Sequence, residues 1–254
     1  MVALAFKRRF LKRPIQKIEN EYDQAASTYD EKWSSYTKRS IGGALERNQC
    51  FFQEIDSSIN GGKCNVLDVG SGTGAFAFAI HEQFPHWNMT CFDLSEEMLN
   101  QAQTKNWSSR DNVHFVKGST NNLPFPDNSF DLVTTISSFH FWDDPGVCLS
   151  EIRRVLRPNG TFMLTDWCGD FLSCKMCSVV LRARGYSRES WDIPSQNYVG
   201  TLLQKAGFGM KLQESYSIKL RMFRIGPRWG MMSFVATPRN MHSSDSLHQS
   251  KMRK

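Results

Sequence analysis

The chain alternates short apolar runs with stretches in which apolar residues recur every three or four positions. The run CNVLDV at 64–69 has the length of a buried strand, whereas PGVCLSEIRRVLR at 145–157 has the spacing of one apolar helix face. By the same criteria, we expect strands at 89–93, 113–118, 132–137, 161–167, 211–220 and 231–237, and helices within 14–60 and at 75–84, 95–105 and 197–208. The segment 123–131 is predicted to be a loop because Pro and Asn interrupt it.

Strands that alternate with helices predict βαβ units and a parallel sheet covered by helices. The fold class expected is α/β: a doubly wound, mostly parallel seven-stranded sheet with helices on both faces, Rossmann-like, with an antiparallel last strand. The segments 211–220 and 231–237 are expected to pair as an antiparallel edge hairpin. In such sheets a ligand binds beyond the carboxyl ends of the strands, near the point where the strand order reverses.

Positive charge is concentrated at the two ends of a chain whose net charge is +6. Residues 7–17 hold six basic residues and no acidic one, and the tail is polar and basic. Both ends are interpreted as solvated and partly disordered. For the first of them, a weak contact with anionic membranes or nucleic acid and an organellar transit peptide are the alternatives. The predicted organisation is a basic arm at 1–18, one domain at 19–238 and a disordered basic tail at 239–254.

The seven cysteines are an odd number, and several of them lie in apolar segments. A free thiol in such a segment behaves as a small apolar side chain, so we expect a reducing compartment and no disulfide framework. No apolar run approaches the roughly 20 residues of a transmembrane helix, and no secretory signal pattern opens the chain. The expected location is cytoplasmic, or organellar after removal of a transit peptide.

The segment VLDVGSGTG at 66–74 places three glycines directly after the first predicted strand. Turns of this kind usually hold a dinucleotide pyrophosphate at a helix N-terminus. Asp68 argues against that ligand, because like charges about 4 Å apart repel by about 4 kcal/mol at an intermediate dielectric constant. A ligand with positive charges, such as S-adenosylmethionine, is favoured instead. Asp93, at the end of the second strand, is placed to accept hydrogen bonds from the ribose hydroxyls of either ligand.

Four segments, VLDVGSGTG, FDLSEEML, LPFPDNSFDLV and EIRRVLRPNGTFMLTDW, together resemble the class I S-adenosylmethionine-dependent methyltransferases. The chain is most similar to the branch with the ubiquinone/menaquinone-biosynthesis and malonyl-carrier methyltransferases, roughly over residues 19–238. The segment YDQAASTYDEKW at 22–33 also resembles that branch, in which a Tyr-Asp pair lies over the cofactor. The resemblance implies an enzyme that transfers a methyl group from S-adenosyl-L-methionine to a small-molecule acceptor by in-line displacement.

The loop argument and the resemblance together give a set of cofactor-binding residues. In the resembled family, the glycines approach the methionine part, Asp93 takes the ribose, and Leu94 and Met98 flank the adenine. Ile136 would lie beside the methionine chain, and Tyr29 would close over it. The full set is Tyr29, Asp68, Gly70, Ser71, Gly72, Gly74, Asp93, Leu94, Met98, Ser119, Thr120 and Ile136.

Ser119 departs from the family pattern. The family usually has Gly-Asp-Ala where this chain has Gly-Ser-Thr at 118–120, and the aspartate accepts from the adenine amino group. A serine hydroxyl can also accept a hydrogen bond, but it carries no charge. We therefore expect this contact to be weaker, or to be moved to Asn121.

His140 is the candidate catalytic base. It lies in SSFHFWDD at 137–144, which follows the fourth strand, where the acceptor is expected, and a base is needed only if the acceptor must lose a proton. The alternative is a histidine packed or capped in the loop. Asp143 and Asp144 precede a proline and are interpreted as helix caps. Asp166 either orients the acceptor or accepts from backbone amides.

Residues 168–196 are the least family-like stretch, and such enzymes often build an acceptor lid there. Trp142, Trp167 and Trp191 are candidates to line an apolar acceptor pocket, with core packing as the alternative. The same stretch contains three cysteines, Cys168, Cys174 and Cys177, which are interpreted as buried thiols; binding of a soft metal or metalloid and redox pairing are the alternatives. No metal site is predicted.

Three other functions compete with the methyltransferase prediction. They are a cofactor-binding partner protein without activity, a nicotinamide-dependent oxidoreductase, and a nucleic-acid methyltransferase. The last would carry an Asn/Asp-Pro-Pro-Tyr motif after the fourth strand, and SSFHFW contains none, so no nucleic-acid partner is expected. The sequence leaves the methyl acceptor and the oligomeric state open.

Overall fold

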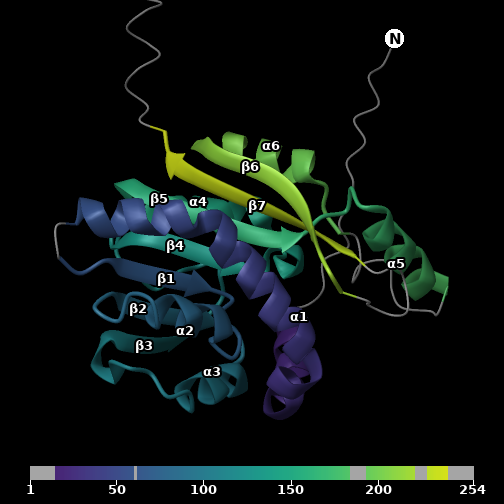
Figure 1. The fold of residues 1–254 in the computed structure, drawn as a ribbon, viewed down its shortest axis with the longest axis horizontal. Coiled ribbons are helices and arrows are strands. Elements are labelled where there is room, and N and C mark those ends of the chain that lie inside the picture. The colour runs from purple at the N-terminus through teal and green to yellow at the C-terminus, as the bar shows by residue number, and fades with distance from the viewer. Residues whose placement is uncertain (1–14, 60–61, 184–192, 221–227, 240–254) are drawn as a thin grey trace, which may run out of the picture.

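A computed structural model describes residues 15–59, 62–183, 193–220 and 228–239 of the chain (Figure 1). The strands are β1 (Asn65–Val69), β2 (Asn88–Asp93), β3 (Val113–Lys117), β4 (Phe130–Ile136), β5 (Leu156–Trp167), β6 (Phe208–Ile218) and β7 (Trp229–Pro238). The helices are α1 (Ile15–Ser58), α2 (Ala75–His81), α3 (Glu96–Gln103), α4 (Pro145–Val155), α5 (Leu172–Ala183) and α6 (Gln196–Lys205). Short 3₁₀ helices lie at Arg110–Asn112 and Phe139–Phe141.

The strands form one seven-stranded sheet in the order β3-β2-β1-β4-β5-β7-β6. Strands β1 to β5 are parallel to their sheet neighbours among themselves, and β7 is antiparallel to both β5 and β6. The mostly parallel sheet and its antiparallel last strand are therefore confirmed. The two final strands pair as expected, with β6 at the edge and β7 inserted between it and β5.

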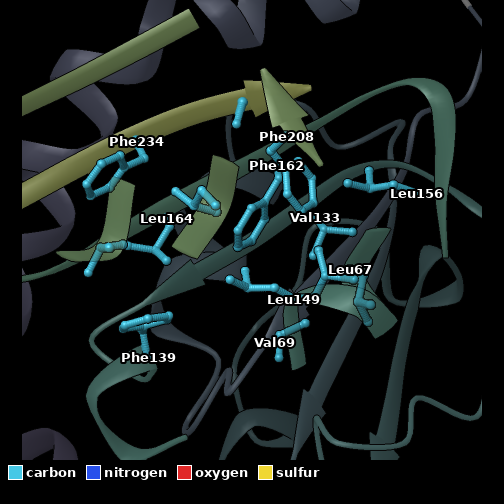
Figure 2. Packing of buried hydrophobic residues seen from close by; sticks show 14 of the residues in the cluster. Leu67, Val69, Val133, Phe139, Leu149, Leu156, Phe162, Leu164, Phe208 and Phe234 are labelled. Carbon is cyan, nitrogen blue, oxygen red and sulfur yellow. The ribbon is translucent and has the colours of Figure 1, made fainter. Parts of the chain in front are cut away.

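Helices cover both faces of the sheet because its strands alternate their apolar side chains between two layers. Leu67 and Val69 pack with residues of α4 and α6 on one face, and Figure 2 shows this layer around Leu149 and Phe162. Val66 packs instead with residues of α1, α2 and α3 on the other face. Burial of both faces explains why the central strands read as almost continuous apolar runs.

Several elements differ from the sequence prediction, among them β5, which starts at Leu156 and not at residue 161. Phe130 begins β4 although it was expected in a loop, because it pairs with β5 at Leu156 and is buried. The helix expected to reach residue 208 ends earlier: Gly207 has φ +84°, a backbone conformation that favours glycine, and β6 starts directly after it. Helix α5 was not assigned from the sequence; its Cys174 and Cys177 are three positions apart and so lie on one face of it.

Within the described residues, helix α1 runs from Ile15 to Ser58, so residues 15–18 of the expected basic arm are helical. The rest of the expected arm, the expected tail from residue 240 onward, and Trp191 lie outside the described residues. Within the described part of the chain, none of the helices has the length and apolar character needed to cross a bilayer.

Candidate active site

A cavity lies at the carboxyl edge of the sheet, between the strand ends and the first turns of α1. The ends of β1 and β4 both contribute to its wall, which places it where the strand order reverses. Five residues predicted to bind the cofactor line it: Gly70, Asp93, Leu94, Ser119 and Thr120. Apolar and aromatic side chains face these polar groups, as is usual in small-molecule sites.

The glycine loop is shaped by backbone conformation and by close packing. Gly70, Gly72 and Gly74 all have positive φ, at +69°, +54° and +71°. A Cβ on Gly70 would lie 2.0 Å from the Ser138 hydroxyl oxygen, and one on Gly74 would lie 2.9 Å from the side chain of Ala102. Around Gly72, by contrast, a Cβ would meet no protein atom within 4 Å. Packing therefore excludes side chains at the first and third glycines, and conformation alone favours glycine at the second.

Asp93 ties the loop to the end of β2. One carboxylate oxygen accepts the Gly72 N–H at 2.7 Å, and the other accepts the Ser95 N–H at 2.9 Å. Burial raises the pKa of Asp93 above its ordinary value, although these backbone hydrogen bonds act in the opposite direction. Because a carboxylate offers about four acceptor positions, Asp93 can still accept the two hydroxyls of a ribose in the adjoining cavity.

Tyr29 lies near Asp93, although it is not part of the cavity wall. Its pKa is raised to about 12 by burial and, to a lesser extent, by the negative charges of Asp93 and Asp30. A protonated phenol beside a carboxylate can donate a hydrogen bond. That Tyr29 closes over the methionine part of the cofactor stays a prediction.

Asp68 and Met98 are buried behind the cavity wall and not in it, which differs from their expected placement. Asp68 sits within β1, between Cys91 of β2 and Thr134 of β4, and is 1% exposed. It accepts a hydrogen bond from the Thr134 hydroxyl at 2.7 Å, and burial raises its pKa to about 7. Met98 is buried because α3 turns its apolar face to the sheet. The electrostatic argument assumed that this carboxylate faces the ligand, whereas Asp68 is buried and is not part of the cavity wall.

Ser71, Gly72 and Gly74 shape the loop behind the wall, and Ile136 packs against the core cluster on the α1 side of the sheet. Ser119 lines the cavity, and its hydroxyl accepts the Asn121 N–H at 3.4 Å. Asn121 lines the cavity as well, and its side-chain oxygen accepts a hydrogen bond from the Cys148 thiol at 2.9 Å.

The first turns of α1 close one side of the cavity. Ile15, Ile18, Glu19 and Tyr22 line it, on one helix face at i, i+3, i+4 and i+7. Sequence reasoning missed these residues, although their spacing within a predicted helix was a usable signal. In Figure 1 α1 crosses the sheet and continues past α3, with which it is in contact.

Carboxylates on α1 hold this helix against the cofactor loops. Asp23 accepts from the Ser95 hydroxyl at 2.5 Å, and Asp30 accepts from the Thr73 hydroxyl at 2.5 Å. Asp30 also pairs with Lys105 at 2.7 Å, and Glu19 pairs with Lys117 at 2.9 Å. The contacts join α1 to both the glycine loop and the α3 region, so the helix is fixed over the cavity at several points. The residues that these α1 carboxylates contact are Thr73, Ser95, Lys105 and Lys117.

His140 and Asp166 form a buried pair beside the cavity. The His140 Nδ1 lies 2.7 Å from one carboxylate oxygen, and the His140 backbone N–H donates to the other at 3.1 Å. The Trp167 N–H also donates to Asp166, at 2.6 Å. The two alternatives for Asp166 thus resolve toward accepting backbone amides, with the imidazole as an additional partner. Since a carboxylate can only accept, Nδ1 carries the proton.

The other imidazole nitrogen, His140 Nε2, is buried and makes no hydrogen bond to the described residues. The ring stacks on Trp167, with centroids 4.5 Å apart and planes 15° apart, and lies 4.0 Å from the ring of Phe141. Phe141 in turn lines the cavity. His140 itself is not part of the cavity wall, and its ring lies directly behind Phe141.

Asp144 is the N-cap of α4, as expected, and accepts from the Gly146 and Val147 N–H groups. Asp143, in contrast, lines the cavity. Trp142, one of the three tryptophans considered for an acceptor pocket, lines it as well. Ser137 and Ser138 also line it and were not predicted as site residues.

Cys168, Cys174 and Cys177 are buried thiols, as favoured from the sequence. Burial raises the pKa of each to about 11, so they are protonated at neutral pH. No cluster of three or more potential metal ligands was found among the described residues.

Comparison with known proteins gives the family. The family model described as a methyltransferase domain matches residues 67–164. A ubiquinone/menaquinone biosynthesis C-methyltransferase of Rickettsia bellii is 32% identical over 168 residues, which cover 57% of this chain and 68% of the relative. A demethylmenaquinone methyltransferase of Leptospira interrogans is 27% identical over 225 residues, covering 80% and 86%.

Solved structures show the same fold. A methyltransferase in complex with the Trm112 activator of Haloferax volcanii superposes with a TM-score of 0.66 at 21% identity, over 87% of this chain and 98% of that one. A SAM-dependent methyltransferase of Thermotoga maritima gives 0.63 at 18% identity, over 87% and 100%. The nicotinamide alternative is thereby set aside, and S-adenosylmethionine is the methyl donor. The chain belongs to the class I S-adenosylmethionine-dependent methyltransferases, in the family of the ubiquinone/menaquinone biosynthesis C-methyltransferases.

Proposed function

We propose that the protein methylates a small-molecule acceptor whose attacking group must lose a proton, and that His140 takes that proton. The observation that carries the proposal is the buried Nε2 of His140, which lacks a hydrogen-bond partner among the described residues while Asp166 holds the other ring nitrogen. Such an arrangement fixes the tautomer and leaves a basic lone pair on Nε2. A packed structural histidine would more commonly use both nitrogens.

The aromatic surroundings favour a flat ring as the acceptor. The His140 imidazole lies between Trp167 and Phe141. The ring of Phe141 makes an edge contact with that of Tyr22 on α1, with the ring centroids 5.5 Å apart. Aromatic faces and edges of this kind pack well against another ring. The relatives are named for related acceptors: the Rickettsia protein for ubiquinone and menaquinone biosynthesis, and a rice relative, 28% identical over 171 residues, for 2-methyl-6-phytyl-1,4-hydroquinone. Removal of a hydroquinone hydroxyl proton by a base makes the neighbouring ring carbon nucleophilic toward the methyl group. That carbon then loses its own proton, which restores the hydroquinone ring.

On the cofactor side, the proposal assigns the ribose hydroxyls to Asp93 and the adenine to the region of Leu94, Ser119 and Thr120. S-adenosylmethionine supplies a methyl group already activated on a cationic sulfur. The chain then has to align the acceptor and exclude water. Helix α1 serves the second purpose, because its apolar residues Ile15 and Ile18 close one side of the cavity.

The test is methyl transfer from labelled S-adenosylmethionine to a reduced demethylmenaquinone with a short prenyl chain, followed by mass spectrometry of the product. His140→Gln should lower kcat by about 10²- to 10⁴-fold, the range for loss of a general base. His114→Gln on the exposed part of edge strand β3 is the matched control, and it should leave the rate unchanged. Equal rates for His140→Gln and the wild type would remove His140 from the mechanism.

A further inference from the structure

The hydroxyl of Tyr36 joins three elements that are far apart in the sequence. Tyr36 lies on α1 and is 6% exposed. Its hydroxyl accepts a hydrogen bond from the indole Nε1–H of Trp167 at 2.6 Å and shares a second one with the Ser137 hydroxyl. Ser137 follows β4 and Trp167 ends β5, so one oxygen atom connects α1 with two neighbouring strand ends.

Both partners of this hydroxyl belong to the surroundings of the site. Ser137 lines the cavity and has φ +55°, which is uncommon for a residue other than glycine. Its backbone N–H donates to the Thr165 carbonyl at 2.9 Å. Trp167 provides the ring on which the His140 imidazole stacks. A shift of either partner would therefore move a cavity residue or the proposed base.

The phenol suits this position because each partner needs a specific hydrogen-bonding group. An indole N–H can only donate, so it requires an acceptor, and the phenol oxygen provides one. The phenol proton is then available for the Ser137 oxygen. Burial raises the pKa of Tyr36 well above its ordinary value, so the phenol keeps its proton throughout the physiological range.

We infer that Tyr36 is a positioning residue for methyl transfer. Its hydroxyl holds the indole of Trp167 against His140 and holds Ser137 in its left-handed conformation at the cavity wall. Through this contact, the seating of α1 on the sheet and the orientation of the base depend on each other. The inference rests on the proposed role of His140, and it adds a residue of α1 that no sequence motif indicated.

The first test compares Tyr36→Phe with Tyr216→Phe by NMR, and it needs no acceptor. Tyr216 is a matched control: it is buried in the same hydrophobic cluster, and its hydroxyl makes no hydrogen bond to the described residues. The readouts are the indole ¹H–¹⁵N signal of Trp167, identified with Trp167→Phe, and the imidazole ¹⁵N signals of His140, identified with His140→Gln. In Tyr36→Phe, the indole proton should exchange with solvent roughly tenfold faster, and the imidazole signals should shift.

Tyr216→Phe should leave both signals in place. Unchanged Trp167 and His140 signals in Tyr36→Phe would overturn the inference, and so would equal changes in the two variants, because those would reflect packing alone. The NMR result does not depend on whether any acceptor is methylated. It therefore distinguishes failure of this inference from failure of the proposed function.

The second test measures turnover with the reduced short-chain demethylmenaquinone. Tyr36→Phe should lower kcat by about tenfold and move the acidic limb of the pH–rate profile, whereas Tyr216→Phe should do neither. A rise in the acceptor KM alone, with kcat and the pH profile unchanged, would contradict a positioning role. Thermal unfolding of both variants establishes that the folded state is compared in each case.

Discussion

Asp93 combines two functions at the level of a single side chain, because it accepts backbone N–H groups of two loops and also faces the cavity. We expect Asp93→Asn to weaken S-adenosylmethionine binding by roughly 1–3 kcal/mol, about five- to 150-fold in Kd. An amide retains one acceptor oxygen but presents a donor toward an N–H group, so at least one contact is lost. Isothermal titration calorimetry measures the change.

Asp131→Asn is the matched control for Asp93→Asn. Asp131 also accepts a backbone N–H, from Asn65 at 2.9 Å, and pairs with Arg157, but it lies at the start of β4, at the opposite edge of the sheet. Its substitution should lower stability without changing the affinity for the cofactor. An unchanged affinity in Asp93→Asn would show that the ribose is not bound there.

Asp68 leads to a prediction about pH. Its pKa is about 7 in the folded protein, mainly because of burial, against 3.8 for an ordinary aspartate. Between about pH 4 and pH 7, the folded state therefore holds a proton that the unfolded state has released. The contribution of Asp68 to stability is largest below pH 4 and is lost as the pH rises through 7.

The change that isolates this effect is Asp68→Asn, which cannot ionise. The unfolding free energy of the wild type minus that of Asp68→Asn should fall by roughly 2–3 kcal/mol from about pH 5 to about pH 8. Urea unfolding at both pH values measures the difference and cancels the titration of the other carboxylates. A difference that rises with pH would mean that Asp68 is ionised and favourably paired in the folded state.

At the scale of elements, local signals predicted what local contacts determine. The glycine loop and the aspartate at the end of β2 each depend on residues a few positions apart, and both are present. The misplacement of Asp68 was also a local matter: it precedes Val69, the last residue of β1, so it lies within the strand between two neighbours. The pattern identified the strand with Asp68 inside it, but not that the pairing with β2 and β4 buries the carboxylate.

The contacts that could not be predicted are those between distant segments. The Tyr36 hydroxyl meets Ser137 across 101 sequence positions and Trp167 across 131. Tertiary packing alone brings these side chains together, and a single sequence carries no periodicity that reports it. The α1 residues at the cavity could be predicted only in part. The sequence pattern predicted the helix, but only the family resemblance indicated that it lies over the strand ends.

At the scale of the whole molecule, the cavity is a junction between α1 and the ends of four strands. A ligand that fills it contacts elements that would separate on unfolding, and it binds the folded state only. S-adenosylmethionine or S-adenosylhomocysteine at about 100 times its Kd should therefore stabilise the protein by about 2.7 kcal/mol. For a domain of this size, the melting temperature should rise by about 5–10 °C.

Differential scanning fluorimetry measures this rise, and two comparisons show whether it reflects specific binding at the cavity. NADH at the same concentration should give no shift, because the site belongs to a methyltransferase; a larger shift with NADH would contradict the assignment of the ligand. Asp93→Asn should show a smaller shift with S-adenosylmethionine than Asp131→Asn does, although both variants begin from a lowered melting temperature.

If α1 closes the site as its contacts with Thr73, Ser95 and Lys105 indicate, the ligand should also slow proteolysis within residues 15–30. Equal cleavage with and without ligand would show that α1 does not close over the bound cofactor.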